Sequence, residues 1–351
     1  MPQPDPQDQL PDTYRRLQAE LSAAAAAGVA GLMAGVALDR IDESWAAIRD
    51  QVVAVILLQQ LYAATMAGAY FAGLMRSLGL QPQPEGVVPP LAFTGYTSAG
   101  IALPDVVDST PVVVKVAIQQ AHQAQAQAAA PALPVRELEL VSARPVPEVP
   151  APSVPPAPAA PAPGRTDPVP QAALDLATRR LARIAMSEVQ DAGRGALEAQ
   201  LRLEPQATGY VRHVTLPACG RCLVLAGRVY TKSTGFLRHP QDDCVMLPVF
   251  GEPPVLQSPR DLFHQMTDAQ QDKAFGLAGA RAIRDNADVG SVLNARRGMD
   301  AAGDSYTRTG QVGVRRRRHA PPRLSPQGVA RAAGDDTVEY RRLLREHGYL
   351  T

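Results

Sequence analysis

Three cysteines and one histidine in the second half of the chain have the types and spacing that point to chemistry. Cys219 and Cys222 form a Cys-x-x-Cys motif. His239 lies 17 positions after Cys222, and Cys244 lies 5 positions after His239. Thiolate and imidazole are the ligands that zinc prefers, and four of them complete a tetrahedron. The spacing therefore predicts a structural zinc site at Cys219, Cys222, His239 and Cys244. A closed four-ligand site leaves no open coordination position, so it does not imply metal catalysis.

Three other interpretations of these residues stay open. A redox pair is expected at a helix start inside a βαβ pattern, and here only a preceding strand is predicted. A catalytic cysteine, Cys219 or Cys222, with His239 as its base is conceivable, although three clustered cysteines look more like ligands. The third interpretation is reduced cysteines with a structural histidine. Other enzyme signatures, such as a nucleophile elbow, a zincin motif, a P-loop or a dinucleotide fingerprint, are missing from the sequence.

Composition limits the classes of protein to which the chain can belong. Its 351 residues fit about two domains plus linkers. Lys and Arg number 35 against 34 Asp and Glu, so no global field points to nucleic acid or to an acidic partner. Three cysteines exclude a disulfide scaffold, and an odd count with one Cys-x-x-Cys suits a reducing compartment.

The elements that must position the cysteines are mostly helices. Apolar residues recur at helical spacing in the N-terminal third, whereas residues 131–170 hold thirteen prolines, which prevent regular structure. The expected fold is mainly α with a small α+β C-terminal module stapled by zinc. The expected parts are a helical N-terminal domain (1–130), a Pro/Ala-rich linker (131–170), a C-terminal domain with the Cys/His site (171–300), a basic flexible loop (301–325) and a C-terminal helix (326–351).

Local signals place the elements more finely. Two long helices, 11–38 and 42–79, with Asp42 as the cap of the second, should pack as an antiparallel pair. We expect a loop with little regular structure over 80–108 and a helix over 109–129. A further helix should follow Pro170, weakened at its end by Gly193 and Gly195, and a strand should cover 210–216. Capping boxes should start helices at Ser258 and Thr267, the second running through Ile283, and a charged helix should cover 338–347.

Membrane and nucleic-acid association are both weakly indicated. The start of the sequence lacks the basic region of a signal peptide. Residues 21–38 and 51–75 carry no charge, but the first stretch is mostly Ala and Gly and the second contains Gln59 and Gln60, so a buried helical hairpin is favoured over a membrane span. The run Arg315, Arg316, Arg317 and Arg318 is either a DNA contact through phosphates or a solvated basic loop.

The ordered motifs of the C-terminal half resemble the MuF-like minor capsid proteins of tailed phages, in the form found in actinobacterial phages and prophages. The matching blocks are Gly209-Tyr-Val-Arg212, Cys219-x-x-Cys222-Leu-Val-Leu-Ala-Gly227, Gly235-Phe-Leu-Arg-His239-Pro240 with Cys244, Phe275-Gly-x-Ala-Gly-Ala280 with its continuation to Met299, and Leu343-Leu-x-x-x-Gly348-Tyr349-Leu350. The N-terminal helix with Leu38-Asp39 and Trp45 also fits. One departure is that Asp242 stands where the family has the first cysteine of a His-Pro-x-Cys-x-Cys segment, so Asp242 is a substitute or supporting ligand beside Cys244.

The resemblance implies a role in head morphogenesis. Such proteins are minor head components inside the procapsid near the portal, so the implied partners are the portal and the major capsid protein. Because this sequence shows no protease signature, we expect a non-enzymatic role. The implied locations are the host cytoplasm during assembly and then the interior of the virion. Because some family members are fused to or encoded beside a capsid maturation protease, a maturation protease or another Cys/His hydrolase is the alternative function.

Overall fold

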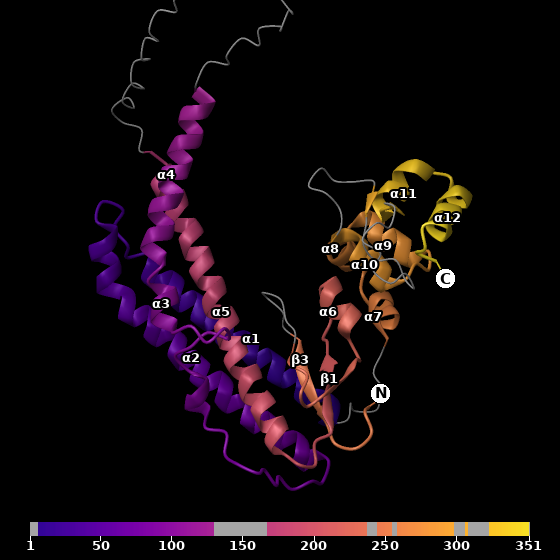
Figure 1. The fold of residues 1–351 in the computed structure, drawn as a ribbon, viewed down its shortest axis with the longest axis horizontal. Helices are drawn as coiled ribbons and strands as arrows, with labels where there is room; N and C mark the ends of the chain where they lie inside the picture. Colours follow the sequence, from indigo (N-terminus) through magenta and orange to yellow (C-terminus); the bar gives the residue numbers. More distant parts are fainter. Residues whose placement is uncertain are drawn as a thin grey trace, which may run out of the picture. The chain divides into compact units, whose positions relative to one another are not determined.

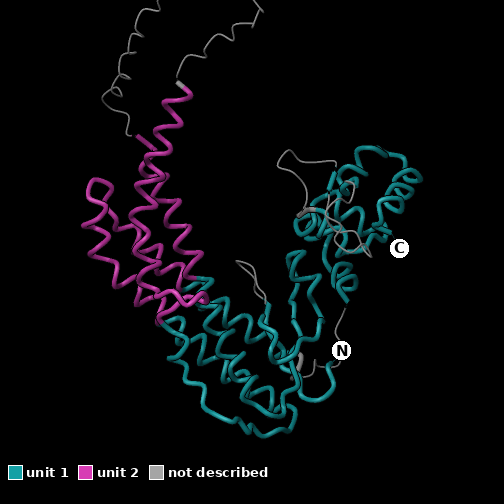
Figure 2. Tube along the Cα trace, viewed as in Figure 1, with its two compact units in different colours: residues 1–24, 58–94, 186–351 teal, residues 25–57, 95–185 magenta. Residues whose placement is uncertain are grey.

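The protein is mainly helical with a few small sheets. The computed structural model describes residues 6–129, 167–236, 244–254, 258–297, 306–307 and 323–350. The element order can be followed in Figure 1. Two compact units are built from interleaved stretches of chain (Figure 2): unit 1 comprises 1–24, 58–94 and 186–351, and unit 2 comprises 25–57 and 95–185.

The first five helices and one 3-10 turn supply the helical part of the chain. They are α1 (Pro6–Met33), α2 (Ile41–Ser77), η1 (Pro90–Phe93), α3 (Leu103–Val107), α4 (Thr110–Ala129) and α5 (Val169–Leu203). The predicted antiparallel pair is present: in unit 1, Tyr14 of α1 stacks on Tyr70 of α2, and Gln18 donates to the carbonyl of Ala63. Contacts therefore run in opposite order along the two helices.

Three contacts join the segments of unit 2, one at a glycine and two between oppositely charged side chains. Gly28 of α1 faces Val55 of α2 so closely that a Cβ at position 28 would lie 2.9 Å from a Val55 methyl. Arg49 of α2 forms an ion pair with Asp108 at 2.8 Å, next to the start of α4. Asp42 was predicted to cap a helix that begins at Glu43, but α2 begins two residues earlier, at Ile41, so Asp42 lies in its first turn. Asp42 pairs with Lys115 of α4.

A three-stranded antiparallel sheet forms in unit 1 from β1 (Gly209–His213), β2 (Val229–Thr231) and β3 (Val245–Val249), in the order β2-β1-β3. Tyr210 lies opposite Tyr230 on one side and Pro248 on the other. Gly209 is required at its position, because a Cβ there would lie 2.2 Å from the carbonyl oxygen of Tyr230. The strand is shorter than predicted and ends before Val214.

The remaining helices of unit 1 pack around one buried cluster. They are α6 (Gly220–Leu225), α7 (Pro259–Gln265), α8 (Asp268–Phe275), α9 (Leu277–Arg284), α10 (Val289–Arg297), α11 (Pro326–Ala333) and α12 (Thr337–Glu346). A second small sheet pairs β4 (Tyr306–Thr307) with β5 (Arg323–Leu324), inside the segment predicted as a flexible loop. Phe263, Ile283, Val292, Leu344 and Tyr349 are fully buried in the cluster.

Several local predictions are confirmed and others are wrong. Ser258 and Thr267 both form capping boxes. The helix predicted to run from Thr267 through Ile283 is instead two helices, since Gly276 adopts a φ of +73° between α8 and α9. The region 80–108 has little regular structure, as predicted, and its helical elements are the short η1 and α3.

Helix α5 corrects a further prediction. It runs unbroken through Gly193 and Gly195 to Leu203, whereas the two glycines were expected to weaken it. In unit 1 both glycines serve close packing: a Cβ at Gly193 would lie 2.7 Å from the side-chain oxygen of Gln18, and one at Gly195 would lie 3.1 Å from the ring of Phe93. Tertiary contacts therefore outweigh the low helix propensity of glycine here. The predicted linker lies outside the described residues except at its end, where α5 begins.

Candidate functional site

The two cysteines of the motif lie together at the start of α6. The Cys219 and Cys222 Sγ atoms are 3.4 Å apart, and the Cys222 backbone N–H donates to the Cys219 sulfur. Cys219 is exposed, whereas Cys222 is 2% exposed. Two zinc-bound thiolates at about 2.3 Å from the metal in a tetrahedron lie a little under 4 Å apart, so the pair is already close to a metal-binding separation.

The turn that presents the thiols is held by close packing at Gly220. A Cβ at this position would lie 3.0 Å from the ring of Phe275, 3.2 Å from the carbonyl of Ala274 and 3.2 Å from Leu293. A side chain at this position would require these neighbours to move by a few tenths of an ångström. The glycine of the motif thus lets the turn lie close to α8 and α10.

Cys244 comes from the start of β3 and belongs to the same buried cluster as Cys222. It is 2% exposed, and its carbonyl oxygen accepts a hydrogen bond from Arg194 of α5 at 3.3 Å. Phe236, at the other end of the intervening segment, lies under two guanidinium groups: Arg212 at 3.9 Å and Arg194 at 5.4 Å from the ring centre. Both described ends of the segment that carries His239 are therefore anchored.

The remaining predicted ligands cannot be placed. His239 and Asp242 lie outside the described residues, and so does the basic run of Arg315, Arg316, Arg317 and Arg318. Within the described ranges, no group of three or more His, Cys, Asp or Glu side chains is arranged to hold a metal ion. The structure brings Cys219 and Cys222 together, and the zinc site with His239 and Cys244 remains a prediction. The donor chemistry fits zinc, since the described donors are thiols.

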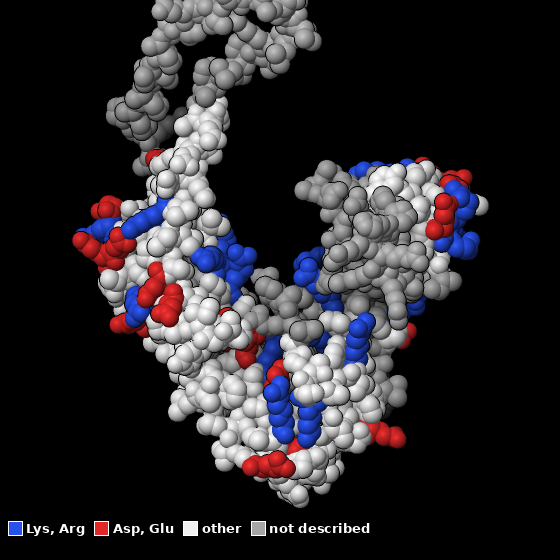
Figure 3. All heavy atoms as spheres, in the orientation of Figure 1, with Lys and Arg blue, Asp and Glu red and all other residues white. Residues whose placement is uncertain are grey.

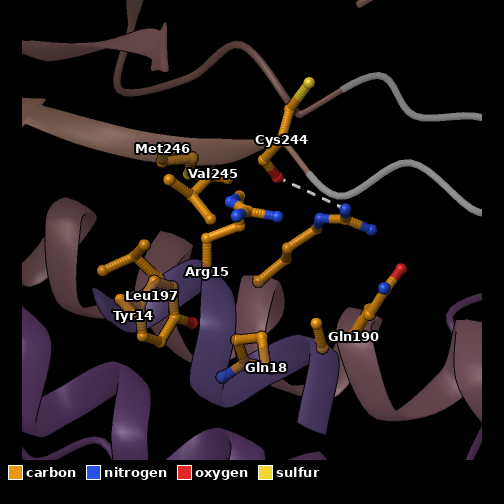
Figure 4. A pocket seen from close by; sticks show the side chains of 10 residues that line it. Tyr14, Arg15, Gln18, Gln190, Leu197, Cys244, Val245 and Met246 are labelled. Atoms are coloured by element: carbon orange, nitrogen blue, oxygen red, sulfur yellow. Dashed lines mark hydrogen bonds between the residues drawn. The ribbon is translucent and has the colours of Figure 1, made fainter. Parts of the chain in front are cut away.

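A small pocket lies beside Cys244 between α1, α5 and β3 (Figure 4). The Cys244 side chain points away from it, and its wall is made mainly by Tyr14, Arg15, Gln18 and Gln190. Its volume is about 20 Å³, enough for a single water molecule and too small for an organic ligand. Burial raises the pKa of Tyr14 far above its ordinary value, so this tyrosine stays neutral. The pocket is therefore part of the packing and is excluded as a substrate site.

A larger cavity in unit 1, of about 630 Å³, contains polar residues that the sequence interpretation missed. Asp12 and His213 line it and are joined by a contact of 2.9 Å between Oδ1 and Nε2, and Thr215 donates to the same Asp12 oxygen. Burial alone would raise the pKa of Asp12, but the hydrogen bonds from Thr215 and His213 outweigh it and lower that pKa.

This cavity offers acid–base groups without a nucleophile. Among the described residues that line it there is no cysteine, serine or lysine. Asp12 and His213 stand 201 positions apart, so no spacing rule applied to the sequence can pair them. Cys219, Cys222 and Cys244 are likewise not among its lining residues. The described part of the cavity therefore gives no support to a Cys/His hydrolase.

Charge and hydropathy define the surface only coarsely. Basic and acidic side chains occur on the face drawn in Figure 3 as small groups separated by uncharged surface, in line with the net charge of +1. Of the described helices, α2 is long and apolar enough to cross a membrane by length and composition, with 33% of its most apolar window buried. A core helix of a soluble protein meets the same criteria, so the prediction that α2 does not span a membrane stays untested.

No known protein family, curated protein or solved structure matches the chain.

Proposed function

We propose that this protein is a minor capsid protein of a tailed phage or prophage that acts without enzymatic activity in head morphogenesis. The observation that carries the proposal is the ordered series of MuF-like blocks between Gly209 and Leu350. A series of motifs in fixed order is far more specific than a single Cys-x-x-Cys.

The blocks include residues that build the core of the described module. Phe275, Ala280, Ile283 and Val292 from one block belong to a single buried cluster. Leu343, Leu344 and Tyr349 from the closing block are in the same cluster. The two blocks therefore pack against each other in one module, as blocks of one domain must.

The proposed metal centre staples this module. Cys219, Cys222, His239 and Cys244 would hold a structural Zn²⁺, with Asp242 as a substitute or supporting ligand. In such modules the free energy of metal binding contributes directly to folding, which suits a segment whose sheets are small. The chain's own contribution is to hold two thiols 3.4 Å apart on the turn that Gly220 locks into place.

The proposed partners are the portal and the major capsid protein, and the helical N-terminal region is the proposed docking element. Contact with DNA through Arg315, Arg316, Arg317 and Arg318 is a secondary proposal, which predicts a steep loss of binding with salt. The proposed locations are the host cytoplasm during assembly and the interior of the virion afterwards.

Two experiments test the function and the metal separately. Peptide mass spectrometry on gradient-purified heads should find this chain in a few copies per particle, and deletion of its gene should give defective heads. Particles that lack the chain, together with normal heads from the deletion, would refute the proposal.

The metal is tested on the purified full chain. Elemental analysis should find one zinc per chain in the wild type and in Arg221→Ala, a control in which an exposed residue inside the motif is changed. Cys219→Ser should lose the zinc and unfold roughly residues 205–300. An unchanged circular dichroism spectrum and melting curve for Cys219→Ser would rule out a structural role for the metal.

A further inference from the structure

We propose that Cys219 and Cys222 are a thiol–disulfide switch: a low-molecular-weight disulfide oxidises the pair to an intramolecular disulfide, and this closure ejects the metal. The first half of the proposal stands on the geometry of the two thiols alone. The second half, metal ejection, rests on the proposed function and its zinc site.

The two sulfurs are placed for closure with a small movement. Their separation of 3.4 Å exceeds a disulfide bond of about 2.05 Å by little more than one ångström. Cys219 is exposed, so rotation of its side chain is less restricted than that of a core residue. Gly220 holds the backbone between them against Phe275 and Leu293, so closure must come from the side chains.

The difference in exposure between the two thiols assigns them different roles. Exposed Cys219 can meet an oxidant from solvent, whereas Cys222 is 2% exposed and can be reached only by its neighbour. Cys244 is equally buried and immediately precedes β3, so it is sheltered from direct attack. An accessible attacking thiol beside a buried resolving thiol is the arrangement that thiol–disulfide exchange requires.

The reaction proceeds in two exchanges with a glutathione-type disulfide as oxidant. The Cys219 thiolate attacks one sulfur of the oxidant, forming a mixed disulfide and releasing one glutathione thiolate. The Cys222 thiolate then attacks the Cys219 sulfur, which forms the Cys219–Cys222 bond and releases the second glutathione thiolate. The two cysteines lose two electrons and two protons, and the oxidant is reduced to two molecules of thiol.

Oxidation removes two ligands from the metal at once. A metal-bound cysteine is a thiolate, and a disulfide sulfur carries no such charge, so the closed pair no longer holds zinc. A chain made in a reducing cytoplasm keeps the pair open, and one exposed to an oxidising exterior closes it. The proposed switch thus distinguishes a reduced form of the protein, present during assembly, from an oxidised form outside the cell.

The test uses the purified full chain, treated with excess oxidised glutathione and then alkylated. Intact mass and peptide mapping should show a chain lighter by two hydrogen atoms, a linked Cys219–Cys222 peptide and an alkylated Cys244 after unfolding. Dithiothreitol should restore three alkylatable thiols. In Cys222→Ser, a stable mixed disulfide of glutathione on Cys219 should accumulate, and in the matched variant Cys219→Ser no glutathione adduct should form on Cys222. Ser233→Ala, a change at an exposed position of unit 1, is the control.

The outcomes separate this inference from the proposed function. Zinc release in step with the linked peptide supports both halves. A linked peptide from a chain that never held zinc supports the switch and removes the metal from the proposed function. A zinc-loaded chain whose Cys219 and Cys222 stay reduced in excess oxidant, or a disulfide that joins Cys244 instead, overturns the inference and leaves the proposed function standing.

Discussion

Gly193 in α5 gives the sharpest test of how unit 1 is packed. Replacing it with alanine raises helix propensity by about 1 kcal/mol in the interior of a helix. The new methyl group, however, would lie 2.7 Å from the Gln18 side-chain oxygen, 2.8 Å from its nitrogen and 2.9 Å from its amide carbon. All three distances are shorter than van der Waals contact, so the Gln18 side chain must move.

Gln18 has little freedom to move. It is 7% exposed, and its amide nitrogen donates to the Ala63 carbonyl at 3.1 Å. Overpacking of a core costs about 1 to 3 kcal/mol, and a lost buried hydrogen bond costs about 1 kcal/mol. These costs exceed the gain in propensity, so we expect Gly193→Ala to destabilise the protein by about 1 to 3 kcal/mol.

Gly73→Ala is the matched control, because this glycine is also inside a helix of unit 1. The nearest atom to its new methyl group would be a Leu10 methyl at 4.0 Å, an ordinary contact. The control should therefore stabilise the protein by up to about 1 kcal/mol. Urea denaturation of both variants measures the difference in unfolding free energy.

A double-mutant cycle with Gln18→Ala identifies the cause. Once the Gln18 amide is removed, the clash disappears and Gly193→Ala should become neutral or stabilising, which gives a coupling free energy of about 1 to 3 kcal/mol. If Gly193→Ala is as stabilising as Gly73→Ala in the presence of Gln18, the packing of α1 on α5 described above is wrong.

Three further predictions concern a cap, a carboxylate and the linker. Ser258→Ala removes the capping box of α7 and should cost about 1 kcal/mol in urea unfolding; no change would contradict the cap. The stabilisation that Asp12 supplies should be complete above its ordinary pKa of 3.8 and lost as pH falls through its lowered pKa, because protonation breaks its bonds to Thr215 and His213. In Asp12→Asn, the melting temperature should therefore fall less steeply at acid pH than in the wild type. An unchanged dependence of the melting temperature on pH would refute the role of Asp12. Shortening residues 131–160 should leave the melting curve unchanged; unfolding would show that they are not a spacer.

The elements predicted correctly from the sequence are those that depend on residues close together in the chain. The capping boxes at Ser258 and Thr267 and the start of α4 near Thr110 follow from side chains within a few residues of each other. The close approach of Cys219 to Cys222 belongs to the same class, since two intervening residues bring the thiols together.

The features that the sequence did not predict depend on contacts between residues far apart in the chain. Helix α5 continues through Gly193 and Gly195, where the glycines leave space for Gln18 and Phe93. The residues near the two glycines in the sequence do not indicate these contacts. The pairing of Asp12 with His213 depends on the position of α1 against β1, which only the folded chain defines. A glycine is ambiguous in a sequence because its two effects, a flexible backbone and space for a neighbour, have opposite consequences for a helix.

The interleaving of chain segments in unit 1 constrains how a ribosome can make this protein. Helix α1 is synthesised before the rest of unit 1, and Asp12 meets its partner His213 only after 201 further residues. At about 5 to 20 residues per second, that delay is about 10 to 40 seconds. During this time the apolar face of α1 lacks the part of its core that Leu197 and Met246 supply. Unit 1 can therefore complete its core only after β3 has been synthesised.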